Sequence, residues 1–142
     1  SATLTMARLM IDSGHSPLPK QPKRLVVVFQ PHRYSRIKQF LKDFAIALSQ
    51  SDLILLAPVY SAGETAIKGV TSQSLAKQIK QNNSMLPVIA ADSLKQIPDL
   101  IKNHTQENDL ILTMGAGNIN ELWETLKSQK HSDTCQTSRL AA

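Results

Sequence analysis

Cysteine and aromatic residues are scarce in this sequence of 142 residues. Cys135 is the single cysteine, and aromatic side chains make up 4% of the chain. One cysteine cannot form a disulfide within the chain and provides no cluster of thiolates for a metal, which favours a reducing compartment. We therefore expect a cytoplasmic protein that holds no metal.

Long apolar runs are missing as well. The longest run, at residues 53–59, is far shorter than the ~20 residues that a membrane-spanning helix requires. Residues 1–10 lack the charged and then apolar order of a signal peptide. We expect a soluble domain with no membrane partner.

The common catalytic and phosphate-binding motifs are also absent. The chain contains no Walker loop (Gly-x-x-x-x-Gly-Lys-Ser/Thr), no His-Glu-x-x-His, no Cys-x-x-Cys and no Gly-x-Ser-x-Gly. His15, His104 and His131 have no partner at the spacing of metal ligands. We expect no ATP hydrolysis by this chain alone.

The charge balance is basic, with 16 Lys and Arg against 11 Asp and Glu and a net charge of +5. The cations are spread along the chain and stacking aromatics are few, so we expect no nucleic-acid partner. A moderate positive field equally suits a domain that handles phosphates and carboxylates.

Short apolar runs alternate with amphipathic segments along the chain. The runs lack polar alternation, which is typical of strands buried on both faces. We predict four strands, at residues 25–29, 53–56, 86–90 and 109–114. Apolar residues at helical spacing predict helices at residues 3–11 and 37–49, after caps at Thr71 and Asp92, and over a segment that holds Ile119 and Leu126.

This order predicts an α/β fold, a Rossmann-like three-layer domain with a mostly parallel sheet and helices on both faces. The length allows one domain, which we place at residues 1–130. From His131 onward the apolar period is lost, and residues 131–142 are expected to form a disordered tail.

Ligands of such sheets bind at the carboxyl ends of the strands. The candidate binding segments are therefore residues 30–36, 59–69, 91–92 and 115–118. The first holds His32, Arg33 and Arg36. Guanidinium groups bind carboxylates and phosphates bidentately. Their positive charge is unfavourable at a helix N-terminus, so arginines at this position indicate ligand binding and not helix stabilisation. A solvated helical turn with locally paired arginines is the alternative.

The second and last segments add polar and small residues. Tyr60 and Glu64 supply a hydroxyl and a carboxylate, although an ordinary connecting loop would also explain them. Gly115 and Gly117 precede a predicted helix start at Asn118, where free backbone N–H groups can cradle an anion. Glycines of a tight turn would give the same pattern.

Three blocks resemble the C-terminal domain of the Mur ligase family, and most of all its members that join L-alanine to UDP-N-acetylmuramate. They are Val-Phe-Gln-Pro-His-Arg-Tyr-Ser-Arg at residues 28–36, Val-Tyr-Ser-Ala-Gly-Glu at residues 59–64 and Thr-Met-Gly-Ala-Gly-Asn-Ile at residues 113–119. The similarity runs from about residue 2 to residue 127, and the first block is the most specific.

The resemblance implies one domain of a three-domain, ATP-dependent ligase of peptidoglycan biosynthesis. The other domains would bind the UDP-sugar, ATP and Mg²⁺, and ATP would phosphorylate the lactyl carboxylate before the alanine amine attacks. This chain would position L-alanine and close over that site, inactive alone and with no cofactor bound. The implied substrate-binding residues are His32, Arg33, Arg36, Gly115, Gly117 and Asn118, with Tyr60 and Glu64 as weaker candidates.

The family's domain begins with a strand that ends in Asp-Asp-Tyr-x-His-His-Pro, which has no counterpart before residues 3–11. The resemblance thus implies a sheet without its first strand, and an exposed sheet edge favours a marginally stable or homodimeric fragment. A different class of function is left open, a stand-alone α/β regulatory module that binds a nucleotide or phosphosugar. Tight binding by the chain alone would distinguish that module.

Overall fold

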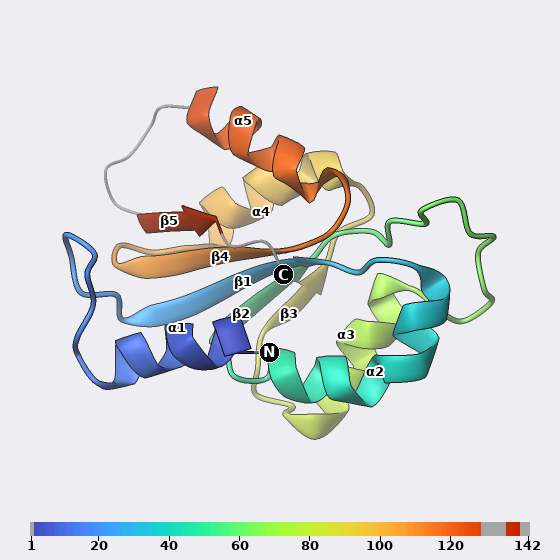
Figure 1. Cartoon of the computed structure of the whole chain (residues 1–142), viewed down its shortest axis with the longest axis horizontal. Helices are drawn as coiled ribbons and strands as arrows, with labels where there is room; N and C mark the ends of the chain where they lie inside the picture. The colour runs from blue at the N-terminus through green and yellow to red at the C-terminus, as the bar shows by residue number, and fades with distance from the viewer. Residues whose placement is uncertain (1, 129–135, 140–142) are drawn as a thin grey trace.

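The computed structural model describes residues 2–128 and 136–139, which form one sheet of five parallel strands covered by helices (Figure 1). The strands lie in the order β3-β2-β1-β4-β5. Their bounds are β1 Arg24–Gln30, β2 Leu53–Leu56, β3 Val88–Ala90, β4 Asp109–Gly115 and β5 Gln136–Arg139. The helices are α1 Ala2–Asp12, α2 Tyr34–Leu48, α3 Ser72–Asn82, α4 Ile97–His104 and α5 Glu121–Ser128, with 3-10 turns η1 Leu94–Gln96 and η2 Asn118–Asn120.

Helices cover both faces of the sheet because the central strands are apolar on both. In β1, Leu25, Val27 and Phe29 pack in the core shared with α1, α2 and α3. Val26 and Val28 pack in the second core, with α4 and α5. All five side chains are buried, which explains why the run has no polar alternation. The predicted three-layer Rossmann-like fold is confirmed.

The direction of the chain across the sheet reverses at β1. From β1 the chain continues to β2 and β3 on one side, and it then crosses to β4 on the other. Such a reversal marks the usual ligand site of an open α/β sheet, beyond the carboxyl ends of the two flanking strands. Here the last residues of β1 and β4, Gln30 and Gly115, are paired in register. We call this end of the sheet the carboxyl edge.

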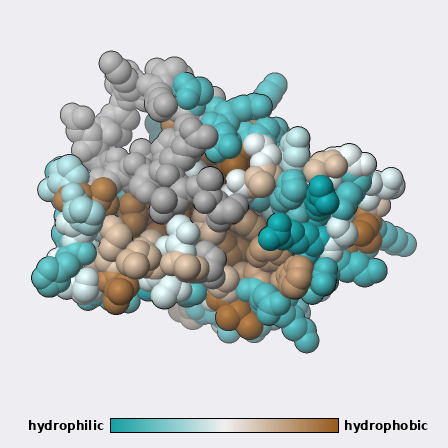
Figure 2. Space-filling view, viewed as in Figure 1, coloured by the Kyte–Doolittle hydropathy of each residue, from teal (hydrophilic) through white to brown (hydrophobic). Residues whose placement is uncertain are grey.

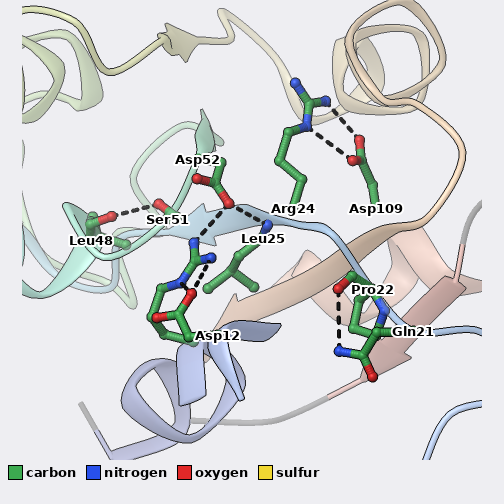
Figure 3. A network of polar contacts seen from close by, with 10 residues as sticks. Asp12, Gln21, Pro22, Arg24, Leu25, Leu48, Ser51, Asp52 and Asp109 are labelled. Carbon is green, nitrogen blue, oxygen red and sulfur yellow. Dashed lines mark hydrogen bonds and ion pairs between the residues drawn. The ribbon is translucent and has the colours of Figure 1, made fainter. Parts of the chain in front are cut away.

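Ion pairs join neighbouring elements at the opposite edge, where the strands begin (Figure 3). Nε and Nη2 of Arg24, at the start of β1, donate to the carboxylate of Asp109, at the start of β4, at 2.9 and 2.7 Å. Asp109 is 1% exposed. Arg8 of α1 pairs with both Asp12 and Asp52 at 2.8 Å, which ties α1 to the start of β2. These contacts hold the fold together at the edge remote from the candidate binding segments.

The predicted cap at Asp92 is wrong. The N–H of Asp92 donates to Oε1 of Gln96, and its carboxylate accepts from Gln73 at 3.5 Å. The chain instead enters the helical stretch through η1 after Ser93, and α4 follows with Pro98 in its first turn. Proline suits a first turn because its missing N–H would have no partner there.

The strand prediction at residues 86–90 is too long at its start. β3 begins at Val88, directly after Pro87, which has no N–H to give to a strand ladder. The predicted disordered tail also differs from the structure, because residues 136–139 form β5 beside β4. Residues 131–135 and 140–142 of that prediction lie outside the described residues.

Apolar surface gathers over α1 in the view of Figure 2. Met6 and Leu9 of α1 are 59% and 58% exposed. Beside them an open apolar hollow of about 350 Å³ lies between α1 and β4, lined in part by Leu110 and Leu112. In residues 2–128 and 136–139, no helix combines the length and the apolar character needed to cross a membrane.

Candidate functional site

The loops that follow β1 and β2 are joined at the carboxyl edge. His32 and Tyr60 form a short parallel bridge, and their rings stack with centroids 5.7 Å apart and an interplanar angle of 11°. The N–H of Arg33 donates to the carbonyl of Tyr60, and the N–H of Tyr60 donates to the carbonyl of Pro31, each at 2.8 Å. The first two predicted segments thus form one wall.

The glycine loop, residues 115–117, packs directly against this wall. A Cβ added at Gly117 would lie 2.7 Å from Cγ of Tyr60, and one at Gly115 would lie 2.8 Å from the carbonyl oxygen of Gln30. The φ angles of Gly115 and Gly117 are 147° and 152°, which residues with a side chain rarely adopt. Glycine is therefore required for the close approach of β4's end to β1 and to the Tyr60 ring.

Gln30 holds the start of the last helical segment through both ends of its side-chain amide. The residue is 3% exposed. Nε2 of Gln30 donates to Oδ1 of Asn118 at 2.7 Å, and its Oε1 accepts the N–H of Ile119 at 2.9 Å. The anion cradle expected at this helix start is thus already partly filled, because the N–H of Ile119 is bound within the chain.

Arg33 has an unusual backbone. It occupies the N-cap position of α2 with φ 65° and ψ 132°. A residue with a side chain adopts such a conformation at a cost of about 1–3 kcal/mol and keeps it only where its surroundings impose it. The hydrogen bond from its N–H to Tyr60 is one such restraint. The strain falls on a residue that the sequence already marks as a candidate for ligand binding.

The guanidinium groups of Arg33 and Arg36 are exposed at the start of α2. In the part of the chain that the structure describes, neither forms an ion pair within 4 Å. Arg8 and Arg24, at the opposite edge, both hold carboxylates. The two cations of the carboxyl edge are therefore open to an anionic ligand.

Glu64 caps α2 from the loop after β2. Its Oε1 accepts the hydroxyl of Ser35 at 2.6 Å, and its Oε2 accepts the N–H of Ser35 at 3.1 Å. These two hydrogen bonds lower the pKa of Glu64, with a smaller contribution from the charge of Arg33. A carboxylate is favoured at a helix N-terminus, where the backbone N–H groups lack partners. The structure thus shows Glu64 in a contact that fixes the beginning of α2.

The remaining predicted segment, residues 91–92, borders the first two segments, because Ala91 and Asp92 line one hollow with Tyr34 and Val59. This polar hollow of about 210 Å³ lies at the ends of β2 and β3. Thr71, at the start of α3, borders the same hollow and forms the predicted cap with a reciprocal hydrogen bond to Ser74. Tyr34 is the residue of the α2 start that reaches this hollow.

Two residues of the site, Gln30 and Ser35, lie in the candidate segment 30–36 but were not singled out by the sequence patterns. Gln30 could have been noticed as the polar last residue of an otherwise apolar strand that must be buried. Ser35 carries no such signal, because its partner Glu64 lies 29 residues away in the sequence.

Comparison with known proteins places these residues in a family. Residues 8–117 match the family model described as Mur ligase, glutamate ligase domain. The chain is 54% identical over 141 residues to the UDP-N-acetylmuramate–L-alanine ligase of Prochlorococcus marinus (strain MIT 9313), which covers 99% of this chain and 29% of the relative. It is 52% identical over 128 residues to the ligase of the same name from Synechococcus sp. (strain CC9311), which covers 90% of this chain and 26% of the relative.

Proposed function

The chain belongs to the Mur ligase family, and we propose that it acts as the alanine-binding C-terminal domain of a UDP-N-acetylmuramate–L-alanine ligase. Two relatives that carry this name support the proposal, because their sequences match this chain over nearly its whole length. The chain spans 29% of the Prochlorococcus marinus relative. ATP-dependent ligation, in the cytoplasm and in peptidoglycan biosynthesis, is therefore proposed for a longer protein that contains this domain.

The pair of exposed cations at the carboxyl edge carries the proposal. An amino acid that acts as a nucleophile must have its carboxylate held while its amine stays free to attack. Arg33 and Arg36 would hold the alanine carboxylate or a nearby phosphate. The stacked rings of His32 and Tyr60 would form the wall beside them.

The contribution of such a domain is positioning. Holding two reactants in the right geometry can lower the barrier by about 7–11 kcal/mol. The short contacts among the three loops suit this role, because Gly117 packs on Tyr60 and Glu64 fixes the start of α2. Closure of this edge over a neighbouring domain would also exclude water.

We propose that the other domains of the longer protein hold ATP and Mg²⁺. The sequence of this chain has no Walker loop, and within the described residues no three His, Cys, Asp or Glu side chains gather closely enough to hold a metal ion. In those other domains, ATP would activate the carboxylate of UDP-N-acetylmuramate. The isolated chain would then have no ligase activity.

Steady-state kinetics of the full-length protein test the site. Arg33→Ala and Arg36→Ala should each raise the KM for alanine or lower kcat by about 10- to 100-fold, because each would remove a charge-assisted hydrogen bond. Lys77→Ala, an exposed lysine of α3, is the control and should keep wild-type constants. Near-wild-type kinetics in both arginine variants would contradict the assignment.

Calorimetry of the isolated chain separates the proposal from a stand-alone binding module. Titration with ATP, UDP-N-acetylmuramate and alanine should give no tight binding if the other domains complete the site. Tight binding of the nucleotide or of the sugar would instead favour the regulatory module. Sedimentation of the same sample tests the proposed homodimer of the isolated chain.

A further inference from the structure

Gln30 is a buried polar residue at the end of a strand that is otherwise apolar. It is 3% exposed, and its neighbours Phe29 and Val28 belong to the two cores. An amide in such a place is costly unless both of its ends are hydrogen-bonded. Both ends are used here, and both partners lie in the turn η2 that follows the glycine loop.

The partners fix the orientation of two side chains in succession. The N–H of Ile119 can only donate, so it must meet Oε1 of Gln30, at 2.9 Å. Nε2 of Gln30 therefore faces Asn118 and must meet an acceptor, which is Oδ1 at 2.7 Å. Because the oxygen and nitrogen of an amide point in different directions, the NH₂ group of Asn118 is turned away from Gln30.

We infer that Gln30 is a positioning residue that sets the amide of Asn118 so that its NH₂ group donates to an anionic oxygen of the ligand, a role that rests on the proposed function. The polarity follows from a backbone N–H, which cannot be reversed by rotating a side chain. Asn118 is half-buried and directly follows Gly117, which packs on the Tyr60 wall. The anionic oxygen belongs to a carboxylate or to a phosphate.

The same hydrogen bonds explain why this donor is needed. The N–H of Ile119 is bound to Gln30 and is not offered to a ligand. The side chain of Asn118 then replaces it as a donor from the start of the last helical segment. Together with Arg33 across the edge, it would give the ligand donors on two sides.

Two substitutions, one at residue 30 and one at residue 118, replace the donor that the side chain of residue 118 offers to the ligand by an acceptor. Both leave the hydrophobic cores unchanged. In Gln30→Glu, an ionised carboxylate at residue 30 can still accept from the N–H of Ile119, but it cannot donate to Asn118, whose amide should turn its oxygen toward the ligand. In Asn118→Asp, the bond from Gln30 is kept, but a carboxylate oxygen replaces the donor. Gln81→Glu, at an exposed position of α3, adds the same charge remote from the site.

The kinetic test uses the full-length protein with alanine, ATP and UDP-N-acetylmuramate varied in turn. Gln30→Glu and Asn118→Asp should each raise the KM for one ligand about tenfold or more, and Gln81→Glu should leave all three unchanged. A rise for alanine alone identifies a carboxylate, and a rise for ATP identifies a phosphate. Three KM values within about twofold of wild type in Gln30→Glu would overturn the inference.

A second readout does not depend on turnover. The side-chain NH₂ signals of Asn118 in ¹⁵N spectra should shift in Gln30→Glu and stay in place in Gln81→Glu, while the N–H of Ile119 should remain protected from hydrogen exchange. Unshifted NH₂ signals would overturn the positioning role. If wild-type protein did not ligate alanine, the proposed function would fail, and these signals would still decide the orientation of Asn118.

Discussion

Ser35 donates both its hydroxyl and its backbone N–H to the carboxylate of Glu64. The loop after β2 therefore caps the helix after β1, and no residue adjacent to α2 in the sequence does so. Arg33, which occupies the N-cap position, makes no side-chain cap. The position of Arg33 and Arg36 thus depends on a contact between distant segments.

Replacing Glu64 should change how stability depends on pH. The pKa of Glu64 is lowered in the folded state by the hydroxyl and then by the N–H of Ser35. A carboxyl whose pKa is lower in the folded than in the unfolded state stabilises the fold above its unfolded pKa, and this contribution is lost as pH falls through the folded pKa. The difference in melting temperature between wild type and Glu64→Gln should be present at neutral pH and vanish in acid. Glu107→Gln, at the opposite edge, serves as the charge-matched control, and a difference independent of pH would contradict the cap.

Arg33→Gly should separate stability from function. Glycine relieves the strain of φ 65°, which costs about 1–3 kcal/mol, and it adds about 0.4–1 kcal/mol of unfolded-state entropy. The variant should unfold at equal or higher denaturant than wild type and still lose ligation. The matched change Arg36→Gly, inside α2, should cost about 1 kcal/mol. Equal losses of stability in the two variants would show that Arg33 is not strained.

Gly117→Ala should destabilise the carboxyl edge by about 1–3 kcal/mol, because the new Cβ would lie 2.7 Å from Cγ of Tyr60 at a φ of 152°. Gly14→Ala also has a positive φ, of 69°, but nothing lies within 4 Å of its Cβ, so it shows the cost of an alanine at a positive φ without a close contact. Chemical denaturation of both variants gives the contribution of the close contact. Adding Tyr60→Ala to Gly117→Ala should recover part of the loss, and no recovery would exclude the ring as the cause.

Asp109→Ala should destabilise the fold without changing the proposed alanine site. The carboxylate is 1% exposed and accepts two hydrogen bonds from Arg24, so its removal leaves a partly buried cation without this partner. We expect a loss of about 2–4 kcal/mol in denaturant unfolding. Because the pair lies at the opposite edge, the KM for alanine should not change at temperatures where the variant stays folded. A selective rise in that KM would show coupling between the two edges.

The strands and layers could be predicted because they depend on local composition. The apolar run in β1 has no polar face to expose to water, so it is expected to be buried on both faces. The structure has it at the centre of the sheet. The errors fall where one residue alters a local rule. β3 begins only after Pro87, which cannot donate a backbone hydrogen bond. α4 begins next to Pro98, which suits a first helical turn, and not at the predicted cap Asp92.

The candidate site was predictable only in part. The rule that ligands meet the ends of parallel strands brought Arg33, Tyr60 and Gly117 to one edge. It could not show that the ring of Tyr60 rests on Gly117, or that Arg33 has a strained backbone. Both depend on side chains from different loops meeting in the folded state, and a single sequence does not contain those distances.

The position of β1 also sets an order of events during synthesis. Its neighbour β2 follows soon after it, but its other neighbour, β4, begins at Asp109, and the partners of Gln30 lie 88 and 89 residues further on. While the chain leaves the ribosome, one side of this very apolar strand therefore has no strand to pair with until most of the domain has been made. A nascent chain with such an unpaired strand is open to association with other chains. The arrangement that places the proposed ligand-binding edge at the middle of the sheet thus delays its completion until most of this domain has been made, and chaperones that shield emerging apolar segments should matter most in that interval.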